Sequence, residues 1–379
     1  MVSLWSLRSS RLFFYEDPLV KPTLSLPRIT EPANLDEWVR HLVDIHFHPV
    51  HGTPFWLERS RDLGIDARRD IRCYEDLSLL GFFPMDALRS RNVLDFLPAD
   101  IAKDRSRLRI HETGGTTGAP ARIAVRDYFE PVNRFMNWYL DEVVGFPRGE
   151  NWLFIGPTGP HGIADSTRQT AQTRGGMCHF IDLDTRFIKI LYQKQEMKTL
   201  GLYMEHVRRQ AFGILDTQDV RVLGTTPVLI QTLAPELKKR GYRFTGMMYG
   251  GTQLTRDLLH LLCTEYFPDA VHTAVYGNTL MGGALLGPVR AGEVNVVYYA
   301  MEPLVKIDVV NLEKPDLPVG MHETGQICLS VLSEERFLPR ILERDEAERW
   351  DVLPALGWEG VANVRPLARL QNTVTEGVY

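Results

Sequence analysis

From about residue 108 onward, short apolar runs that end in glycine alternate with segments that begin at a helix cap. Trp152–Ile155 is an apolar run closed by Gly156, and Val271–Tyr276 is closed by Gly277. Between them, Thr226 and Pro227 are typical of a helix start, with a cap followed by a first-turn proline. Met247–Tyr249 reads as a further strand. This alternation predicts an α/β fold with a largely parallel sheet, in which ligands bind beyond the carboxyl ends of the strands.

The first 110 residues have a different pattern, with short helical segments separated by Pro and Gly. Asn34 is a good N-cap for a helix whose apolar face is formed by Leu35, Trp38, Leu42 and Ile45. Further helices are predicted over 55–63 and 86–94, and another is capped by Thr255. Near the end of the chain, Ile327, Leu329 and Val331 alternate as on a half-buried strand.

Composition excludes several classes of protein. The 379 residues exceed what one hydrophobic core usually spans, so two or more sub-domains sharing a cleft are expected. Lys and Arg number 43 against 48 Asp and Glu, a net charge of −5, which does not favour a nucleic-acid partner. The four cysteines form no C-x-x-C pair, which argues against structural zinc. Without a signal-peptide pattern or a membrane-length apolar run, we expect no membrane association and a cytoplasmic location.

The strongest local signal is the segment of residues 113–120, TGGTTGAP. Its glycines allow backbone N–H groups to approach an anion closely, and its threonines add hydroxyl donors. No Gly-Lys-Ser/Thr follows, so it is not a Walker A loop. By composition alone, a phosphate-binding loop and a flexible turn are equally good interpretations.

Two further segments are weak by themselves. Tyr276-Gly277-Asn278-Thr279 places an aromatic ring and a hydroxyl at a strand end, suited to a base and a phosphate. Residues 340–345, RILERD, end in Asp345, which could hold a ribose diol. Taken alone, the second segment is more typical of a solvated run of charge.

In their order along the chain, these segments resemble the adenylate-forming (ANL) superfamily, and within it the phenylacetate–CoA ligase-like branch. The resemblance covers most of the chain and rests on seven segments: Pro54–Trp56 with Gly64-Ile65, Thr113–Pro120, Thr225–Pro227, Tyr249–Thr252, Tyr276–Thr279, Gly320–Leu329 and Leu338–Asp345. It implies a large N-terminal domain with mixed and parallel sheets flanked by helices. It also implies a division into a helical region (1–110), an adenylate-forming core (111–345) and the vestigial start of a truncated C-terminal domain (346–379).

The resemblance also implies roles for particular residues. ATP phosphates would be held by Thr113, Gly114, Gly115, Thr116, Thr117 and Gly118, with Thr116 and Thr117 among the catalytic groups. Tyr276 and Gly277 would lie beside adenine, Asp345 would hold the ribose hydroxyls, and Thr279 would approach the α-phosphate as a catalytic residue. Tyr249, Gly250, Gly251 and Gly282 would line the slot between the acid and the nucleotide. His161 would lie beside the carboxylate of the acid as a substrate-binding and catalytic residue, although a plain turn residue explains it equally well.

Three departures from the family pattern bear on activity. Leu280 stands where the family has a Glu that binds Mg²⁺, and Ala119 stands where the loop has a lysine. The chain ends at Tyr379, 34 residues after Asp345 (379 minus 345), and has no lysine after Lys314. The family's small C-terminal domain, which carries a catalytic lysine, would therefore be missing apart from a segment like its start at 360–366. Glu302 is a candidate replacement ligand for Mg²⁺.

The resemblance implies that ATP activates a small, aromatic or otherwise compact carboxylic acid as an acyl-adenylate, in a specialised biosynthetic role. The acceptor would be CoA, a carrier-protein thiol or an amine. Three interpretations stay open: retained catalysis, a partner subunit that supplies the missing lysine, and a non-catalytic acyl- or nucleotide-binding module.

Other chemistries have weaker support. The spacing of His41, His46, His48 and His51 suggests a metal site, but no other ligands complete it. No G-x-S-x-G motif points to a hydrolase. Cys178 beside His179 would face away from it on a strand.

Overall fold

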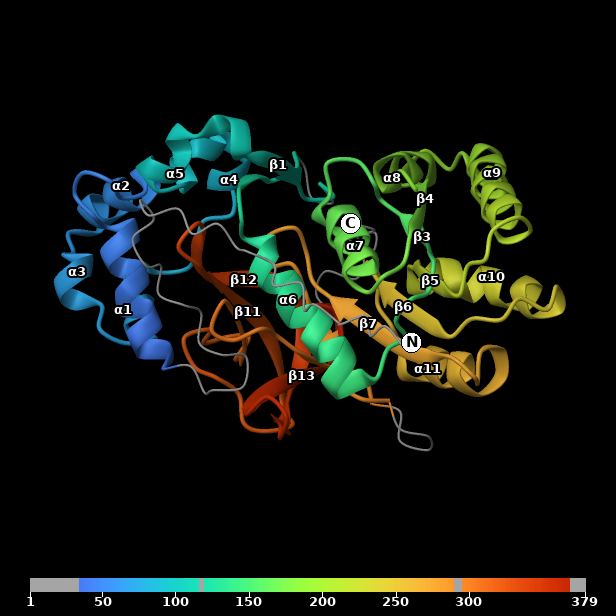
Figure 1. The fold of residues 1–379 in the computed structure, drawn as a ribbon. Helices are drawn as coiled ribbons and strands as arrows, with labels where there is room; N and C mark the ends of the chain where they lie inside the picture. Colours follow the sequence, from blue (N-terminus) through green and yellow to red (C-terminus); the bar gives the residue numbers. More distant parts are fainter. Residues whose placement is uncertain (1–33, 116–118, 290–294, 369–379) are drawn as a thin grey trace, which may run out of the picture. The chain divides into compact units, whose positions relative to one another are not determined.

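The computed structural model describes residues 34–115, 119–289 and 295–368, and these residues form one compact unit (Figure 1). Three predicted site residues, Thr116, Thr117 and Gly118, lie outside the described residues. None of the helices in the described ranges is both long and apolar enough to cross a membrane.

The described residues form an eleven-stranded sheet in the order β10-β11-β12-β13-β9-β8-β7-β6-β5-β3-β4. Its parallel half consists of β3 (Trp152–Gly156), β4 (Cys178–Asp182), β5 (Val222–Thr225), β6 (Gly246–Gly250) and β7 (Val271–Tyr276). β3 is buried along its whole length, as expected for a strand covered on both faces. The α/β class is confirmed, and the predicted strands at 152–155, 247–249 and 271–276 are present.

The other half of the sheet is antiparallel, so the expectation of a largely parallel sheet holds for one half only. It contains β8 (Ala284–Leu286), β9 (Val297–Tyr299), β10 (Val305–Val310), β11 (Thr324–Leu332), β12 (Phe337–Leu353) and β13 (Trp358–Pro366). β12 continues through Asp345, where the sequence placed a domain boundary, and β13 joins the same sheet. The sheet is therefore mixed, with a parallel core and an antiparallel extension.

In the described part of the chain, five helices accompany the parallel strands: α7 (Gly162–Thr173), α8 (Thr185–Gln193), α9 (Met197–Leu215), α10 (Pro227–Lys239) and α11 (Arg256–Leu261). A further helix, α6 (Phe129–Tyr139), contacts the antiparallel half, where the hydroxyl of Tyr139 donates to Leu286 O of β8 at 3.1 Å. Thr226 caps α10 by accepting a hydrogen bond from Leu229 N at 3.2 Å, and Thr255 caps α11 in the same way. Both predicted helix starts are confirmed.

The first helices lie beside the antiparallel strands (Figure 1). They are α1 (Leu35–His46), α2 (Pro54–Leu63), α3 (Ala67–Asp70), α4 (Ala87–Ser90) and α5 (Ala99–Lys103). Asn34 caps α1 as predicted. Two indole N–H groups bind the sheet backbone: Trp38 Nε1 donates to Leu332 O at 2.9 Å, and Trp56 Nε1 donates to Phe337 O at 2.8 Å. The helices therefore cover a face of β11 and β12.

Two predictions about local structure were wrong. The helix expected over 86–94 is interrupted, because Arg91 is extended and the side chain of Asn92 accepts a hydrogen bond from Leu94 N at 3.0 Å. An Asn side chain that binds nearby backbone competes with helix formation. β11 is not half-buried: every residue from Gly325 to Leu332 is buried.

Candidate active site

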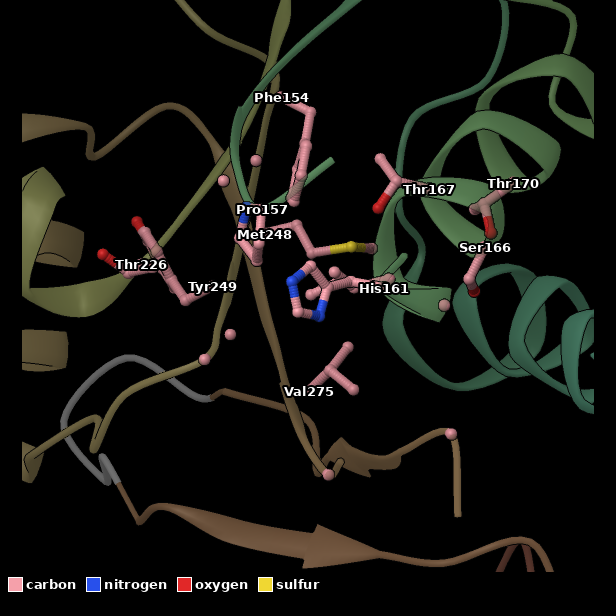
Figure 2. A pocket seen from close by; sticks show the side chains of 18 of the residues that line it. Phe154, Pro157, His161, Ser166, Thr167, Thr170, Thr226, Met248, Tyr249 and Val275 are labelled. Carbon is pink, nitrogen blue, oxygen red and sulfur yellow. The ribbon is translucent and has the colours of Figure 1, made fainter. Parts of the chain in front are cut away.

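A cavity of about 90 Å³ lies at the carboxyl ends of β3, β5, β6 and β7. Its wall is mainly apolar and is formed by Phe129, Val132, Met136, Phe154, Met248 and Val275. Ser166, Thr167 and Thr170 of α7 bring hydroxyl groups to one side (Figure 2). We call this cavity the apolar pocket. A mainly apolar cavity with a few polar groups is typical of small-molecule sites.

His161 lies in the middle of the view of the apolar pocket in Figure 2, beside residues of β3, β6 and α7. Its side chain is buried, and its Nδ1 lies 3.1 Å from Glu112 O. Because a carbonyl oxygen only accepts, Nδ1 carries a proton. Burial, and then the charge of Arg186, lower the pKa of His161 below its usual value. The imidazole is therefore neutral near pH 7, with Nε2 as an acceptor.

A second cavity, of about 70 Å³, adjoins the first and is more polar. Tyr276 and Asp345 line it, and the hydroxyl of Tyr276 donates to Asp345 Oδ2 at 3.1 Å. We call it the polar pocket. It shares Gly251, Val275 and Gly277 with the apolar pocket. An apolar cavity and a more polar one therefore meet at the carboxyl ends of the parallel strands.

The turn after β7 separates the two cavities and is held from several sides. Asn278 Oδ1 accepts hydrogen bonds from Leu280 N at 2.9 Å and Met281 N at 3.3 Å. Thr279 Oγ1 donates to Glu112 O at 3.0 Å, the carbonyl that also binds His161. A Cβ atom on Gly277 would lie 2.2 Å from Gly282 O. Only glycine fits at position 277, which is a packing reason for the predicted Tyr-Gly motif.

Two carboxyl groups on β12 face this turn. Asn278 Nδ2 donates to Glu343 Oε1 at 2.8 Å. Burial, and then the nearby Asp345, raise the pKa of Glu343 to about 7. The register of β12 against β11 shifts between Leu342 and Glu346, and the charge of Asp345 still acts on Glu343.

The Gly/Thr segment connects two short antiparallel strands, β1 (Arg109–Glu112) and β2 (Arg122–Val125). Thr113 closes the base of this hairpin: its N donates to Ala121 O at 3.0 Å, and its Oγ1 accepts from Ala121 N at 2.9 Å. Gly115 has a φ of 64°, a left-handed conformation that suits glycine. Gly114 lies between them. The predicted roles of these three residues in phosphate binding stay predictions.

The remaining predicted substrate residues lie at the rim of the apolar pocket. Tyr249, Gly250, Gly251 and Gly282 all border it. The hydroxyl of Tyr249, however, is paired with His272 Nδ1 at 2.9 Å. Since His272 Nε2 donates to Phe267 O, its Nδ1 must be the acceptor of this bond. The phenol therefore has a structural partner outside the cavity.

The positions considered for metal binding do not converge. Leu280 is 1% exposed, and Glu302 lines neither pocket but pairs with Lys306 Nζ at 3.2 Å. His46 binds Thr53 and Ser333 O, while His41 pairs with Glu334. Over 34–115, 119–289 and 295–368, no three His, Cys, Asp or Glu side chains are grouped as a metal would require. We assign no metal, and a role for Glu302 with Mg²⁺ stays a prediction.

The remaining sequence candidate for covalent chemistry is Cys178, on β4. Burial raises the pKa of its thiol to about 12. A thiol with so high a pKa carries almost no thiolate at neutral pH and is a poor nucleophile.

Several contributors to the site were missed by the sequence reasoning. Glu112 binds four residues from different segments: its carbonyl binds His161 and Thr279, and its carboxylate binds Arg122 and Arg186 at 2.8 Å each. Burial alone would raise the pKa of Glu112, but these two hydrogen bonds lower it. The polar face of α7 was also missed. The Ser and Thr residues over 166–170 recur with the period of a helix, and this spacing could have predicted the polar face of α7 from the sequence.

No protein-family model and no curated protein sequence matches this chain. Solved structures do match in fold. They include 2-hydroxyisobutyryl-CoA ligase with 2-HIB-AMP and CoA in the thioesterification state, at a TM-score of 0.65 and 12% identity over 91% of this chain and 72% of that chain. An open conformation of the same ligase matches at a TM-score of 0.64 and 12% identity, over 92% of this chain and 79% of that chain. The chain therefore shares the fold of the large domain of adenylate-forming enzymes, while the phenylacetate–CoA ligase subtype is not distinguished.

Proposed function

We propose that this protein activates a small carboxylic acid by joining it to AMP at the expense of ATP. The observation that carries the proposal is the pair of adjoining cavities at one edge of the sheet. The apolar pocket suits the body of an acid, and the polar pocket offers Tyr276 to a base and Asp345 to ribose hydroxyls. Their shared wall at Gly251 and Gly277 would place the carboxylate next to the α-phosphate.

The chemistry asks for positioning more than for covalent participation by the protein. A carboxylate oxygen attacks the α-phosphorus, the bond from that phosphorus to the bridging oxygen breaks, and pyrophosphate leaves with the bonding electrons. Holding both reactants in line lowers the barrier by removing freedom before the reaction. Thr279, the backbone of the turn after β7 and the Gly/Thr hairpin are the groups proposed to stabilise charge on the phosphoryl oxygens.

The apolar pocket indicates the kind of acid. Its volume of about 90 Å³ and its Phe, Met and Val side chains favour a compact apolar body, which includes the phenylacetate type. Nε2 of His161 is an acceptor in the free protein, so a carboxylate beside it would favour the protonated ring. We therefore propose that His161 takes up a proton when the acid binds.

The acceptor of the acyl group belongs to the same proposal. CoA, a carrier-protein thiol and an amine all suit an acyl-adenylate. A subunit that supplies the family's C-terminal domain with its catalytic lysine is proposed as a partner, as the resemblance implies.

Pyrophosphate exchange into ATP tests the activity directly. We expect exchange that depends on a carboxylic acid when aromatic, amino and short aliphatic acids are supplied in turn. Addition of a co-encoded small protein would raise the rate if a partner supplies the lysine. Absence of exchange with every class of acid, with and without partners, would contradict the proposal.

One observation favours a second function, that of a binding module without catalysis. Leu280 is buried, so the position offers no oxygen to a divalent cation. We predict that Leu280→Glu lowers the stability by several kcal/mol, because it buries a charge at an apolar position. Thermal melts measure the loss, with Leu280→Met as the apolar control.

The same variant separates the two functions. A binding module predicts no gain in exchange at any Mg²⁺ concentration. If Leu280→Glu keeps the wild-type melting temperature and exchanges faster as Mg²⁺ rises, the module interpretation is wrong.

A further inference from the structure

Three hydroxyl groups of α7 border the apolar pocket, and two of them have partners within the protein. Ser166 Oγ donates to Asn133 Oδ1 at 2.8 Å, and Thr170 Oγ1 donates to Met136 Sδ at 3.4 Å. Thr167 Oγ1 has no hydrogen-bond partner among the described residues, although Thr167 is only 6% exposed. Figure 2 shows its oxygen pointing away from the α7 ribbon and into the cavity. This buried hydroxyl is therefore available to a ligand or to a bound water.

The rest of the pocket wall restricts which chemical group can meet Thr167. No Asp, Glu, Lys or Arg is among the described residues that line the apolar pocket. An ammonium group or a second carboxylate on a bound acid would therefore be buried without a counter-charge, which is costly. A threonine hydroxyl both donates and accepts hydrogen bonds, so a neutral hydroxyl group on the ligand matches it in either direction.

The place of Thr167 along α7 indicates where on the acid this hydroxyl lies. Thr167 follows His161, the residue before the first turn of α7, by six positions (167 minus 161). Because an α-helix rises about 1.5 Å per residue, the two residues lie about 9 Å apart along the helix axis. With the carboxylate beside His161, as proposed above, the hydroxyl belongs at the opposite end of the acid.

We propose that Thr167 is a specificity-determining residue, which binds a hydroxyl group at the end of the acid remote from its carboxylate. The inference deepens the proposed function and rests on it for the presence of an acid in the apolar pocket. The substrate class is then a compact acid with an apolar body and a distal hydroxyl, without an ammonium group or a second carboxylate.

Two matched pairs of acids test the inference on the wild-type protein by calorimetric titration. Phenylacetate and para-hydroxyphenylacetate differ only in a distal hydroxyl, and so do hexanoate and ω-hydroxyhexanoate. In at least one pair we expect the hydroxy acid to bind about fivefold more tightly or better, the usual effect of one hydrogen bond between neutral groups. Mandelate, which has its hydroxyl next to the carboxylate, should bind no more tightly than phenylacetate.

Variants of Thr167 test whether this side chain causes the preference. Thr167→Val keeps the shape and removes the hydroxyl, so it should weaken binding of the hydroxy acid about fivefold or more and change that of the plain acid by less than about twofold. Thr167→Ser keeps the hydroxyl and should retain the preference. Thr173→Val removes an exposed threonine hydroxyl at the end of the same helix and is the matched control, with wild-type affinities expected. Thermal melts of each variant check that the fold is kept.

The outcomes distinguish this inference from the proposed function. If neither hydroxy acid binds more tightly than its plain counterpart, or if Thr167→Val weakens both acids of a pair equally, the inference is overturned. Pyrophosphate exchange with an acid that has no hydroxyl would then leave the proposed function in place. A preference for the hydroxy acid that depends on Thr167, in a protein without pyrophosphate exchange, supports the inference and counts against adenylation.

Discussion

Asp345 is the side chain on which the nucleotide proposal depends most. It lines the polar pocket and accepts a hydrogen bond from Tyr276. We predict that Asp345→Ala weakens AMP binding by about 1–3 kcal/mol, the usual effect of losing hydrogen bonds to a charged group. Calorimetry measures this, and Tyr276→Phe is the control that removes one hydroxyl from the pair. Unchanged affinity in Asp345→Ala would place the ribose elsewhere.

Glu343 predicts a pH dependence of stability. Its pKa is raised from 4.5 to about 7 in the folded protein, so the folded state binds more protons than the unfolded state between these values. Stability contributed by this group therefore falls as the pH rises from about 4.5 to 7, by at most about 3 kcal/mol.

Glu343→Gln keeps an acceptor for Asn278 and removes the titration. We expect the variant to gain stability over the wild type as the pH is raised through this window, measured by urea unfolding at a series of pH values. If the difference in the free energy of unfolding between Glu343→Gln and the wild type does not vary with pH, the raised pKa of Glu343 is contradicted.

At the scale of an element, a side-chain hydrogen bond of Thr113 closes the base of the hairpin of β1 and β2. Thr113 Oγ1 accepts from Ala121 N, and Ala121 is buried. Thr113→Val keeps the shape but leaves this N–H without its acceptor. We predict a loss of about 1–3 kcal/mol in the free energy of unfolding. Thr113→Ser, which keeps the hydroxyl, should lose much less in the same urea titration. Equal losses would show that the methyl group is what matters.

At the scale of the whole molecule, the first helices and the antiparallel strands share a core. Trp56 is 2% exposed, donates to Phe337 O and packs against the ring of Phe337 at 5.4 Å between centroids. We predict that Trp56→Phe lowers the stability by about 1–3 kcal/mol, through the hydrogen bond and the volume lost.

The form of the unfolding transition tests the shared core. We expect one cooperative transition, shifted as a whole in Trp56→Phe and seen alike by far-ultraviolet circular dichroism and tryptophan fluorescence. Two separate unfolding transitions, of which Trp56→Phe shifts only the first, would mean that the helical region before residue 110 folds separately.

The sequence by itself determined the α/β class, the three helix caps, the buried strand that ends at Gly156 and the strands before Gly250 and Gly277. These are local consequences of side-chain hydrogen bonds, proline geometry and apolar runs, which do not depend on distant residues. It also named Tyr276 and Asp345 as candidates for one site, because their segments resemble ordered motifs, and their roles there stay predictions. The structure puts both in the polar pocket.

Only the tertiary structure decided which residues surround those motifs. β11 is covered on both faces because helices from the start of the chain pack on it, and no pattern within β11 reports that. Glu112 binds His161 and Thr279 through its backbone carbonyl, an atom that every residue has. Lys189 reaches Gly115 from a helix 74 positions along the chain, since the turn of the chain after β4 brings α8 back to the hairpin. Contacts of this kind depend on topology, which local sequence patterns do not encode.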